Sequence, residues 1–416
     1  PRPDQSCRSR SPSGIPQPGR TRGVPGRHTD TLTSALPRPH LRRAFGDGPE
    51  VSLFTLGTMR ALSSPEQMLS VLRGALAAGI NHLETAPAYG PAEDFLGQAL
   101  AQLREEQRTP SDGHWVITSK LLPGQSLSSG RQALEASLHR LGISRLDNLA
   151  IHGLNLESHL DWALTGEGAQ LIEGALASGK VGQVGFSSHG SNALIDRAIA
   201  SDRFRFCCLH LHLLDPTRMP LAQQALHRSM GVLAISPADK GGRLQAPSDL
   251  LTQDCRPFQP LHLAYRFLLA AGVSTLSVGA QSASDLDLAR SLASSDGPLD
   301  ALERSTLDHL HQQRAHRLGI DRCGQCRACL PCPKQVPIPD LLRLRNLALG
   351  HDLIEFAGER YNLIGRAGHW WETVDASHCE HCGDCLPRCP HQLSIPDLLA
   401  DTHRLLAAAP RRRLWG

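Results

Sequence analysis

A repeated unit, in which a short β-rich run precedes a longer amphipathic stretch, extends from Val51 to about Ala280. The runs lie at residues 51–57, 81–85, 115–120, 148–152, 181–187, 205–211, 231–235 and 273–278. Strands that alternate with helical patterns indicate parallel βαβ units, and eight of them in roughly 230 residues match the size of a closed (β/α)8 barrel. We therefore predict an α/β fold whose main domain, residues 45–315, is a TIM barrel.

The stretch after the first run illustrates the helical half of the unit. Ser64 is the expected N-cap, Pro65 stands at the first helical position, and Gly79 is the expected stop. Between them, apolar residues recur on one face, as in a helix that packs on a sheet.

Polar residues end three successive runs. Glu84 lies at the end of the second run, Lys120 ends the third and His152 ends the fourth, while Tyr89 follows the second run by a few residues. Because the carboxyl ends of barrel strands meet at one mouth, we expect these four side chains to converge on a catalytic site. The alternative is structural, namely a buried salt bridge beside a core histidine.

Eight of the twelve cysteines form two compact arrays near the C-terminus. The first cysteine array is Cys323, Cys326, Cys329 and Cys332, and the second cysteine array is Cys379, Cys382, Cys385 and Cys389. A proline follows the last cysteine of each array, and the second array has the spacing by which bacterial ferredoxins hold iron–sulfur clusters. In such ferredoxins the fourth cysteine binds the other cluster, so we predict two [4Fe-4S] clusters with exchanged fourth ligands.

Other interpretations of the arrays remain open. Cys-x2-Cys pairs also build structural zinc sites, although zinc does not need a third cysteine at the same step. Disulfides are a further alternative, and a single cluster is another because the first array has a shorter last spacing than the standard run. We expect residues 316–408 to form a smaller, mainly helical ferredoxin-like domain.

The two ends of the chain differ from the rest in composition. Residues 1–44 are rich in Pro, Arg, Ser and Gly and are expected to be a disordered leader, with a transit peptide as the alternative. Residues 409–416 are expected to be a solvated tail. Residues 46–416 have a small negative formal charge, which does not favour a nucleic-acid partner, and no apolar run is long enough to cross a bilayer.

Several of these motifs together resemble the aldo/keto reductase family. They are Leu56-Gly57-Thr58, the stretch 79–100, ITSK ending at Lys120, His152, and GFSSHG at 185–190, in the usual order. The C-terminal part, with VPIPDLL at 336–342, resembles the ferredoxin-like extension of a bacterial subgroup of that family. The sequence differs from the family in two places, because Glu84 stands where aspartate is usual and Leu211 where a tyrosine stacks on nicotinamide.

The resemblance implies a reversible hydride transfer between NADP(H) and a carbonyl or alcohol substrate. Tyr89 would donate the proton, and Lys120 would lower its pKa from about 10. His152 would orient the carbonyl and Glu84 would hold Lys120. The clusters would exchange single electrons with a partner such as a ferredoxin.

Cofactor contacts are expected on the loops that follow the strands. Asn155, Ser187 and Ser188 are candidates to contact the nicotinamide amide. Lys240 lies in a glycine-rich loop that is either a mobile surface turn or a lid or phosphate contact. Gln281 and Ser282 are candidates to meet a phosphate at a helix N-terminus. The alternative function is a non-catalytic redox sensor or electron-transfer or assembly protein. We expect a cytoplasmic location.

Overall fold

The computed structural model describes residues 41–238, 243–367 and 372–408. The expected leader up to residue 40, the loop with Lys240 and the expected tail therefore lie outside the described residues. Within the described residues, no helix combines the length and the apolar character needed to cross a membrane.

Eight parallel strands close into a barrel in the order β10-β3-β4-β5-β6-β7-β8-β9. Their bounds are β3 Phe54–Gly57, β4 His82–Glu84, β5 Val116–Leu121, β6 Leu146–Ile151, β7 Val181–Ser188, β8 Phe206–His210, β9 Gly231–Ile235 and β10 Thr275–Gly279. Two further short strands, β1 (Arg42–Arg43) and β2 (Val51–Ser52), pair antiparallel outside the barrel. Each of the eight predicted runs overlaps a different strand of the barrel, so the predicted (β/α)8 architecture is confirmed.

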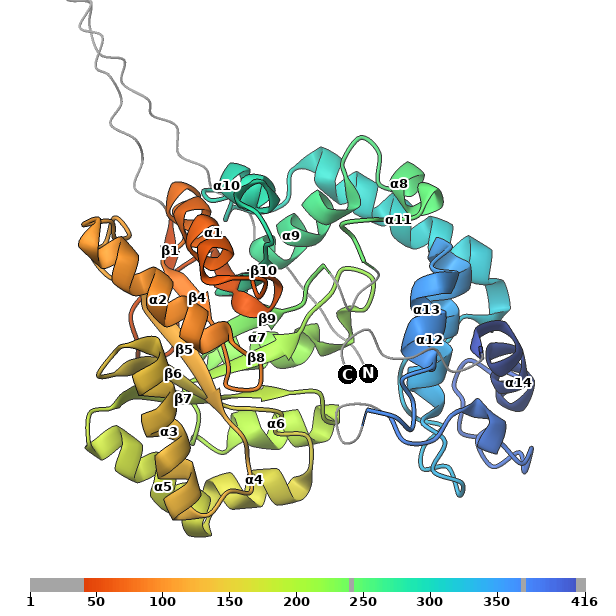
Figure 1. Cartoon of the computed structure of the whole chain (residues 1–416). Coiled ribbons are helices and arrows are strands. Elements are labelled where there is room, and N and C mark those ends of the chain that lie inside the picture. The colour runs from red at the N-terminus through yellow and green to blue at the C-terminus, as the bar shows by residue number, and fades with distance from the viewer. Residues whose placement is uncertain (1–40, 239–242, 368–371, 409–416) are drawn as a thin grey trace, which may run out of the picture. The chain divides into compact units, whose positions relative to one another are not determined.

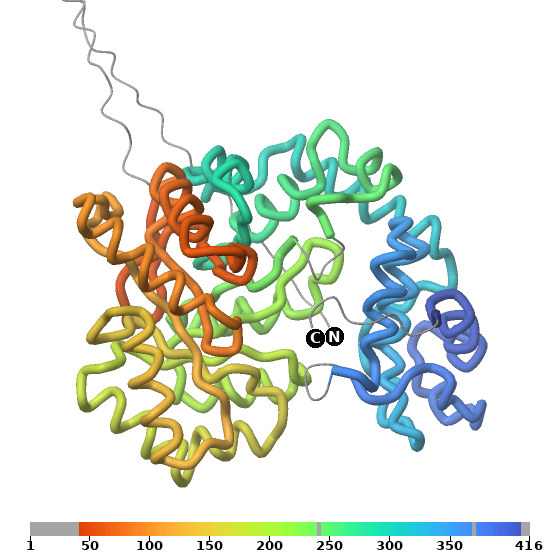
Figure 2. The backbone as a smooth tube through the Cα atoms, in the orientation of Figure 1, coloured from red at the N-terminus to blue at the C-terminus, as the bar shows by residue number. Residues whose placement is uncertain are grey.

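Helices lie outside the ring of strands, and the chain passes round the barrel in sequence order (Figures 1 and 2). Those of the barrel region are α1 Pro65–Ala77, α2 Ala92–Glu105, α3 Leu127–Leu141, α4 Glu157–Leu164, α5 Gly166–Ala177, α6 Asn192–Ala200, α7 Met219–His227, α8 Asp249–Asp254, α9 Pro260–Ala270, α10 Asp287–Ser291 and α11 Ala301–Leu318. Short 3-10 helices are η1 Thr58–Arg60, η2 Pro216–Arg218, η3 Ala283–Leu286, η4 Gly319–Asp321 and η6 Ala376–His378. Buried apolar residues of α1 to α7 and of α9 belong to one hydrophobic cluster with residues of the strands.

Helix α1 shows how the sequence sets such an element. The Ser64 hydroxyl accepts a hydrogen bond from the Gln67 N–H at 3.2 Å, and Pro65 opens the helix. Met68 and Leu72 are fully buried against the barrel. Gly79 follows the helix with φ +72°, a conformation that favours glycine, so both predicted ends of this helix are confirmed.

The interior of the barrel carries a continuous chain of polar side chains. His82 Nδ1 lies 2.7 Å from Thr55 Oγ1, and its Nε2 lies 2.7 Å from Thr118 Oγ1. The chain continues through Asn148 to Gln183, whose amide donates to Asn148 Oδ1 at 2.7 Å. Burial lowers the pKa of His82 to about 3, so this histidine is neutral and the chain links β3 to β7 without a charge.

The C-terminal helices are α12 Ile338–His351, α13 Ile354–Tyr361 and α14 Ile395–Leu406. They share an apolar core with cysteines of the two arrays, among them Cys329, Cys385 and Cys389. Leu347, Leu353 and Phe356 also join a cluster with residues of α8, α9 and α11. The expected domain boundary at residue 315 falls inside α11, so this helix continues from the barrel region into the expected C-terminal domain.

Candidate functional site

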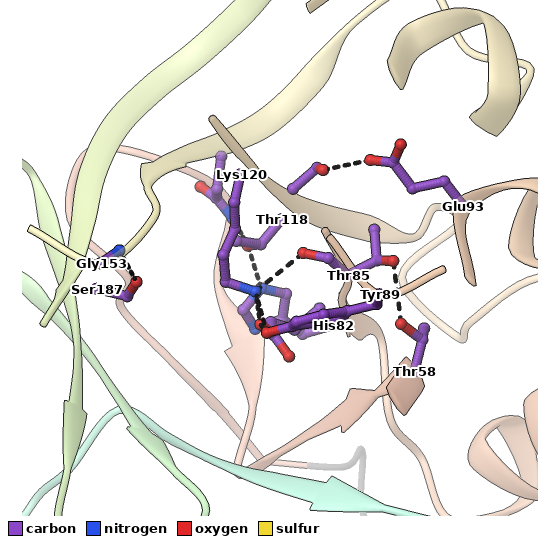
Figure 3. Close-up of polar contacts among 12 residues, drawn as sticks. Thr58, His82, Thr85, Tyr89, Glu93, Thr118, Lys120, Gly153 and Ser187 are labelled. Carbon is purple, nitrogen blue, oxygen red and sulfur yellow. Dashed lines mark hydrogen bonds and ion pairs between the residues drawn. The ribbon is translucent and has the colours of Figure 1, made fainter. Parts of the chain in front are cut away.

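Four side chains that the sequence predicts to meet do meet at the carboxyl ends of β4, β5 and β6. Lys120 Nζ donates a hydrogen bond to the Tyr89 hydroxyl at 2.9 Å and another to the Thr85 carbonyl oxygen at 3.0 Å (Figure 3). It also contacts Glu84 Oε1, and the Tyr89 hydroxyl lies 3.3 Å from the same oxygen. His152 stands edge-on to Tyr89 with ring centroids 5.8 Å apart.

The strand pattern explains why these groups converge. Glu84 is the last residue of β4 and Lys120 lies near the end of β5, and these adjacent parallel strands pair with each other. Both residues are at least 95% buried, so the ion pair lies in a medium where charge interactions are strong. The additional methylene of glutamate does not prevent contact with Lys120. The predicted reach of Glu84 to Lys120 is therefore present in the structure.

Burial governs the protonation of this group. Burial lowers the pKa of Lys120 to about 7, while the adjacent Glu84 carboxylate favours the charged form and opposes that change. Burial raises the pKa of Tyr89 above its ordinary value. The sequence predicts the reverse direction from the neighbouring ammonium, and the loss of solvent around the hydroxyl is the larger effect. Tyr89 is thus a neutral phenol near neutral pH.

Cys208 of β8 lies close enough to Lys120 and Tyr89 for its charge state to affect both. Its side chain is fully buried, and burial raises its own pKa to about 12. The thiol is therefore neutral. The neighbouring Cys207 is also fully buried, as small hydrophobic side chains commonly are.

The loops after β6 and β7 form a second part of the mouth. Ser187 Oγ accepts a hydrogen bond from the Gly153 N–H at 3.0 Å (Figure 3). The Ser188 hydroxyl donates to the Leu154 carbonyl at 2.6 Å, so its proton is already used within the protein. Asn155 Oδ1 accepts from the His189 N–H at 2.7 Å. The predicted cofactor contacts Asn155, Ser187 and Ser188 thus lie together, and Ser188 serves to join the two loops.

Two histidines that the sequence did not indicate as site residues, His189 and His210, lie together next to the end of β7. His210 ends β8, and its Nε2 lies 3.1 Å from His189 Nε2. The alternation along β8 places Cys208 and His210 on the same face, two residues apart. That period was the signal that could have identified His210. His189 and His210 thus place two imidazoles beside the end of β7, where Ser187 lies.

The segment after β10 differs from a simple phosphate site. The N–H groups of Gln281 and Ser282 both donate to Asp285 Oδ2, at 2.8 and 3.2 Å. A carboxylate of the chain itself therefore occupies the position where an anion would bind. The Arg60 side chain lies against Gly279 at the end of β10 and adds a positive charge near this segment.

The cysteines of the two arrays mix in space. Cys323, Cys326 and Cys329 of the first array line one cavity together with Cys389 of the second. Cys332 of the first array lies near Cys385 of the second. Among the described residues, no group of three or more His, Cys, Asp or Glu side chains is arranged to hold a metal ion.

Comparisons with known proteins agree with the barrel. Residues 53–249 match the Aldo/keto reductase family. An aldo-keto reductase of Mycobacterium sp. (strain KMS) is 30% identical over 208 residues, which is 49% of this chain and 70% of that protein. A 6-dehydroglucose reductase of Novosphingobium aromaticivorans is 29% identical over 235 residues, which is 51% of this chain and 74% of the relative.

Solved structures show the same fold. The holo form of aldo-keto reductase AKR11C1 from Bacillus halodurans aligns with a TM-score of 0.55 at 22% identity, over 65% of this chain and 95% of that one. A structure described as aldo-keto reductase (AKR2E5) complexed with NADPH aligns with a TM-score of 0.53 at 19% identity, over 64% of this chain and 86% of that one. The family match ends before the cysteine arrays begin. On these relatives and this barrel, the chain belongs to the aldo/keto reductase family and is an oxidoreductase.

Proposed function

We propose that the barrel catalyses reversible hydride transfer between NADP(H) and a small carbonyl compound or alcohol, with Tyr89 as the proton donor. The observation that carries this proposal is the contact of Tyr89 with both Lys120 and Glu84 at the barrel mouth. When bound, the nicotinamide supplies the hydride. The NADPH complex of a structurally similar aldo-keto reductase supports the choice of cofactor.

The residues of the chain would handle the proton. Tyr89 is protonated near neutral pH because burial raises its pKa, so it can donate to a carbonyl oxygen. The Lys120 ammonium, 2.9 Å from the hydroxyl, would stabilise the phenolate that remains after the proton leaves. His152, edge-on to the Tyr89 ring, would orient the carbonyl oxygen. Glu84 would hold Lys120 charged and in place.

The cofactor would lie across the loops that follow the strands. Asn155 and Ser187 would contact the nicotinamide amide, since Asn155 lies on the loop after β6 and Ser187 lies at the end of β7. Ser188 would act by joining those loops. At the other end of the cofactor, Gln281 and Ser282 would contribute only if Asp285 released their N–H groups. Lys240, a further proposed cofactor contact, belongs to the loop outside the described residues.

We further propose that residues 316–408 form a ferredoxin-like domain that binds two [4Fe-4S] clusters with exchanged fourth ligands. Support comes from the cavity shared by the first three cysteines of the first array and Cys389, and from the proximity of Cys332 to the second array. Cysteine thiolates are the ligands that hold such clusters, so this donor set fits the group. When bound, the clusters supply one-electron steps, for which a ferredoxin-type carrier would be the partner.

Two experiments test these proposals. Anaerobically purified protein should contain about eight irons and eight acid-labile sulfides per chain if both clusters are present. Zinc without sulfide would refute the cluster proposal.

For the barrel, NADPH oxidation should be measured against a panel of aldehydes with wild type and Tyr89→Phe. We expect the variant to lose rate by about a hundredfold or more while NADPH affinity changes little, because the hydroxyl acts in the transition state. A variant that turns over as fast as wild type would exclude Tyr89 as the proton donor.

A further inference from the structure

The Arg218 side chain binds three consecutive backbone carbonyl groups at the barrel mouth. Arg218 ends η2, which follows β8, and its guanidinium donates to three consecutive carbonyl oxygens of the connection between β7 and α6. These acceptors are Ser188 at 3.3 Å, His189 at 3.1 Å and Gly190 at 2.9 Å. Carbonyl groups in a turn otherwise need water or another donor, so the conformation of this loop depends on Arg218.

The segment that Arg218 contacts directly follows the end of β7, where Ser187 and Ser188, two of the proposed cofactor contacts, lie. Ser187 accepts from the Gly153 N–H, and the His189 N–H donates to Asn155 Oδ1. The connections after β6 and β7 are therefore one hydrogen-bonded unit. A shift at the Arg218 end would move Ser187 and Asn155 together.

The Asp215 carboxylate lies between Arg218 and a second arginine, Arg343, of the C-terminal helices. Burial lowers the pKa of Arg218, and the Asp215 carboxylate opposes that effect. Asp215 also pairs with Arg343 of α12 at 3.5 Å, and both side chains are less than 20% exposed. Arg314 of α11 donates to the Leu214 carbonyl at 3.4 Å next to the same carboxylate.

The chain of charges continues toward the cysteines. Asp340, one turn before Arg343 on α12, accepts two hydrogen bonds from Arg327, at 3.1 and 3.3 Å. Arg327 lies within the first cysteine array, between Cys326 and Cys329. Alternating charges thus run from that array along α12 to the loop at the barrel mouth.

We propose that Arg218 is a positioning residue of the active site, and that Arg343, acting through Asp215, holds it in place, so that helix α12 completes the binding side of the barrel mouth. This inference rests on the proposed function. The proton-transfer group of Tyr89 and Lys120 comes from the opposite part of the strand order, on β5 and the connection after β4. Loss of Arg218 should consequently weaken binding more than it slows proton transfer.

The kinetic test compares Arg218→Met, Arg218→Lys and Arg343→Met with wild type. The control is Arg197→Met, which removes an arginine of the adjacent helix α6 that forms an exposed pair with Glu157. We expect Arg218→Met to raise the KM of both NADPH and aldehyde about tenfold or more, with kcat within about threefold and an unchanged pH profile. Arg343→Met should have a smaller effect in the same direction, Arg218→Lys should restore part of the loss, and the control should match wild type.

A second measurement is independent of turnover. Deuterium uptake at the amides of residues 187–191 should be faster in Arg218→Met and in Arg343→Met than in wild type and Arg197→Met, because the loop loses its anchor. If Arg218→Met does not fold, Arg343→Met carries the same test. Unchanged uptake in Arg343→Met would overturn the inference, as would an unchanged KM in an active Arg218 variant. A wild type without carbonyl reductase activity would refute the proposed function instead, and the exchange rates would still decide the positioning role.

Discussion

The ion pair of Glu84 and Lys120 allows the direction and size of a change in the pKa of Lys120 to be predicted from the structure. Lys120 is almost fully buried, burial lowers its pKa to about 7, and its ammonium contacts the Glu84 carboxylate. An opposite charge in contact favours the protonated form of the amine. Two opposite charges about 4 Å apart interact by about 4 kcal/mol at an effective dielectric constant near 20. Glu84→Gln removes that interaction and leaves only the dipole of an amide.

The predicted consequence is a change in the pH profile of carbonyl reduction. Reduction needs the Lys120 ammonium beside Tyr89, so in wild type kcat/KM should fall as the pH rises through about 7. In Glu84→Gln the fall should move to lower pH by at least about one pH unit, since each unit corresponds to 1.36 kcal/mol and the amide retains only part of the attraction. Glu84→Asp keeps the charge and should retain a profile like that of wild type.

The assay is kcat/KM for one aldehyde with NADPH from pH 5 to pH 10 in the three proteins, at constant ionic strength. Thermal unfolding at each pH controls for loss of the folded state. Superimposable profiles for wild type and Glu84→Gln would show that Glu84 does not set the charge of Lys120, and that the glutamate has a purely structural role.

Two other predictions concern the cofactors. Cys389→Ser should damage the same cluster as Cys323→Ser, because both residues line one cavity. The double variant should therefore lose no more iron than either single variant. Additive losses of iron would contradict the exchanged ligation. Asp285→Asn should raise the affinity for NADPH relative to NADH in a fluorescence titration, because it weakens the acceptor that occupies two N–H groups. Asp287→Asn removes an equal charge, which pairs with Arg290, and should leave the affinity for NADPH relative to NADH unchanged. Equal effects of Asp285→Asn and Asp287→Asn would refute the role of Asp285.

The barrel could be predicted from the sequence because each strand is a short apolar run between helical patterns. The fifth run, 181–187, became β7 at Val181–Ser188, and the seventh, 231–235, became β9 at Gly231–Ile235. The polar chain inside the barrel could not be predicted in the same way. Thr55 and Thr118 fit strand positions by propensity alone, and only the closed register shows that His82 joins them.

The residues of the candidate site differ in the same way in how far the sequence predicts them. Residues at strand ends could be predicted, because a strand end fixes both the height and the direction of its side chain. The role of Arg218 could not be predicted, since its contacts depend on how η2 packs against the loop after β7. The role of Asp285 was also hidden, because the sequence shows a polar segment but not which acceptor takes its N–H groups. Loop geometry, more than residue type, is what the sequence leaves undetermined.

The protonation of Tyr89 has a consequence for the direction of the reaction. From the sequence, the ammonium of Lys120 was expected to lower the pKa of Tyr89, whereas in the structure burial raises it. Tyr89 therefore starts with its proton, which suits reduction. In alcohol oxidation, Tyr89 passes its own proton to neutral Lys120, 2.9 Å away, as it takes the hydroxyl proton of the alcohol, so this direction needs Lys120 in its neutral form.

Because burial lowers the pKa of Lys120 to about 7, the two directions should respond oppositely to pH. As the pH rises through about 7, kcat/KM for aldehyde reduction should fall and kcat/KM for alcohol oxidation should rise. Measuring both directions from pH 5 to pH 9 with one aldehyde and its alcohol tests this, and Lys120→Met should abolish the opposition between the two curves. Profiles that rise and fall in parallel would mean that a group other than Lys120 exchanges the proton with Tyr89.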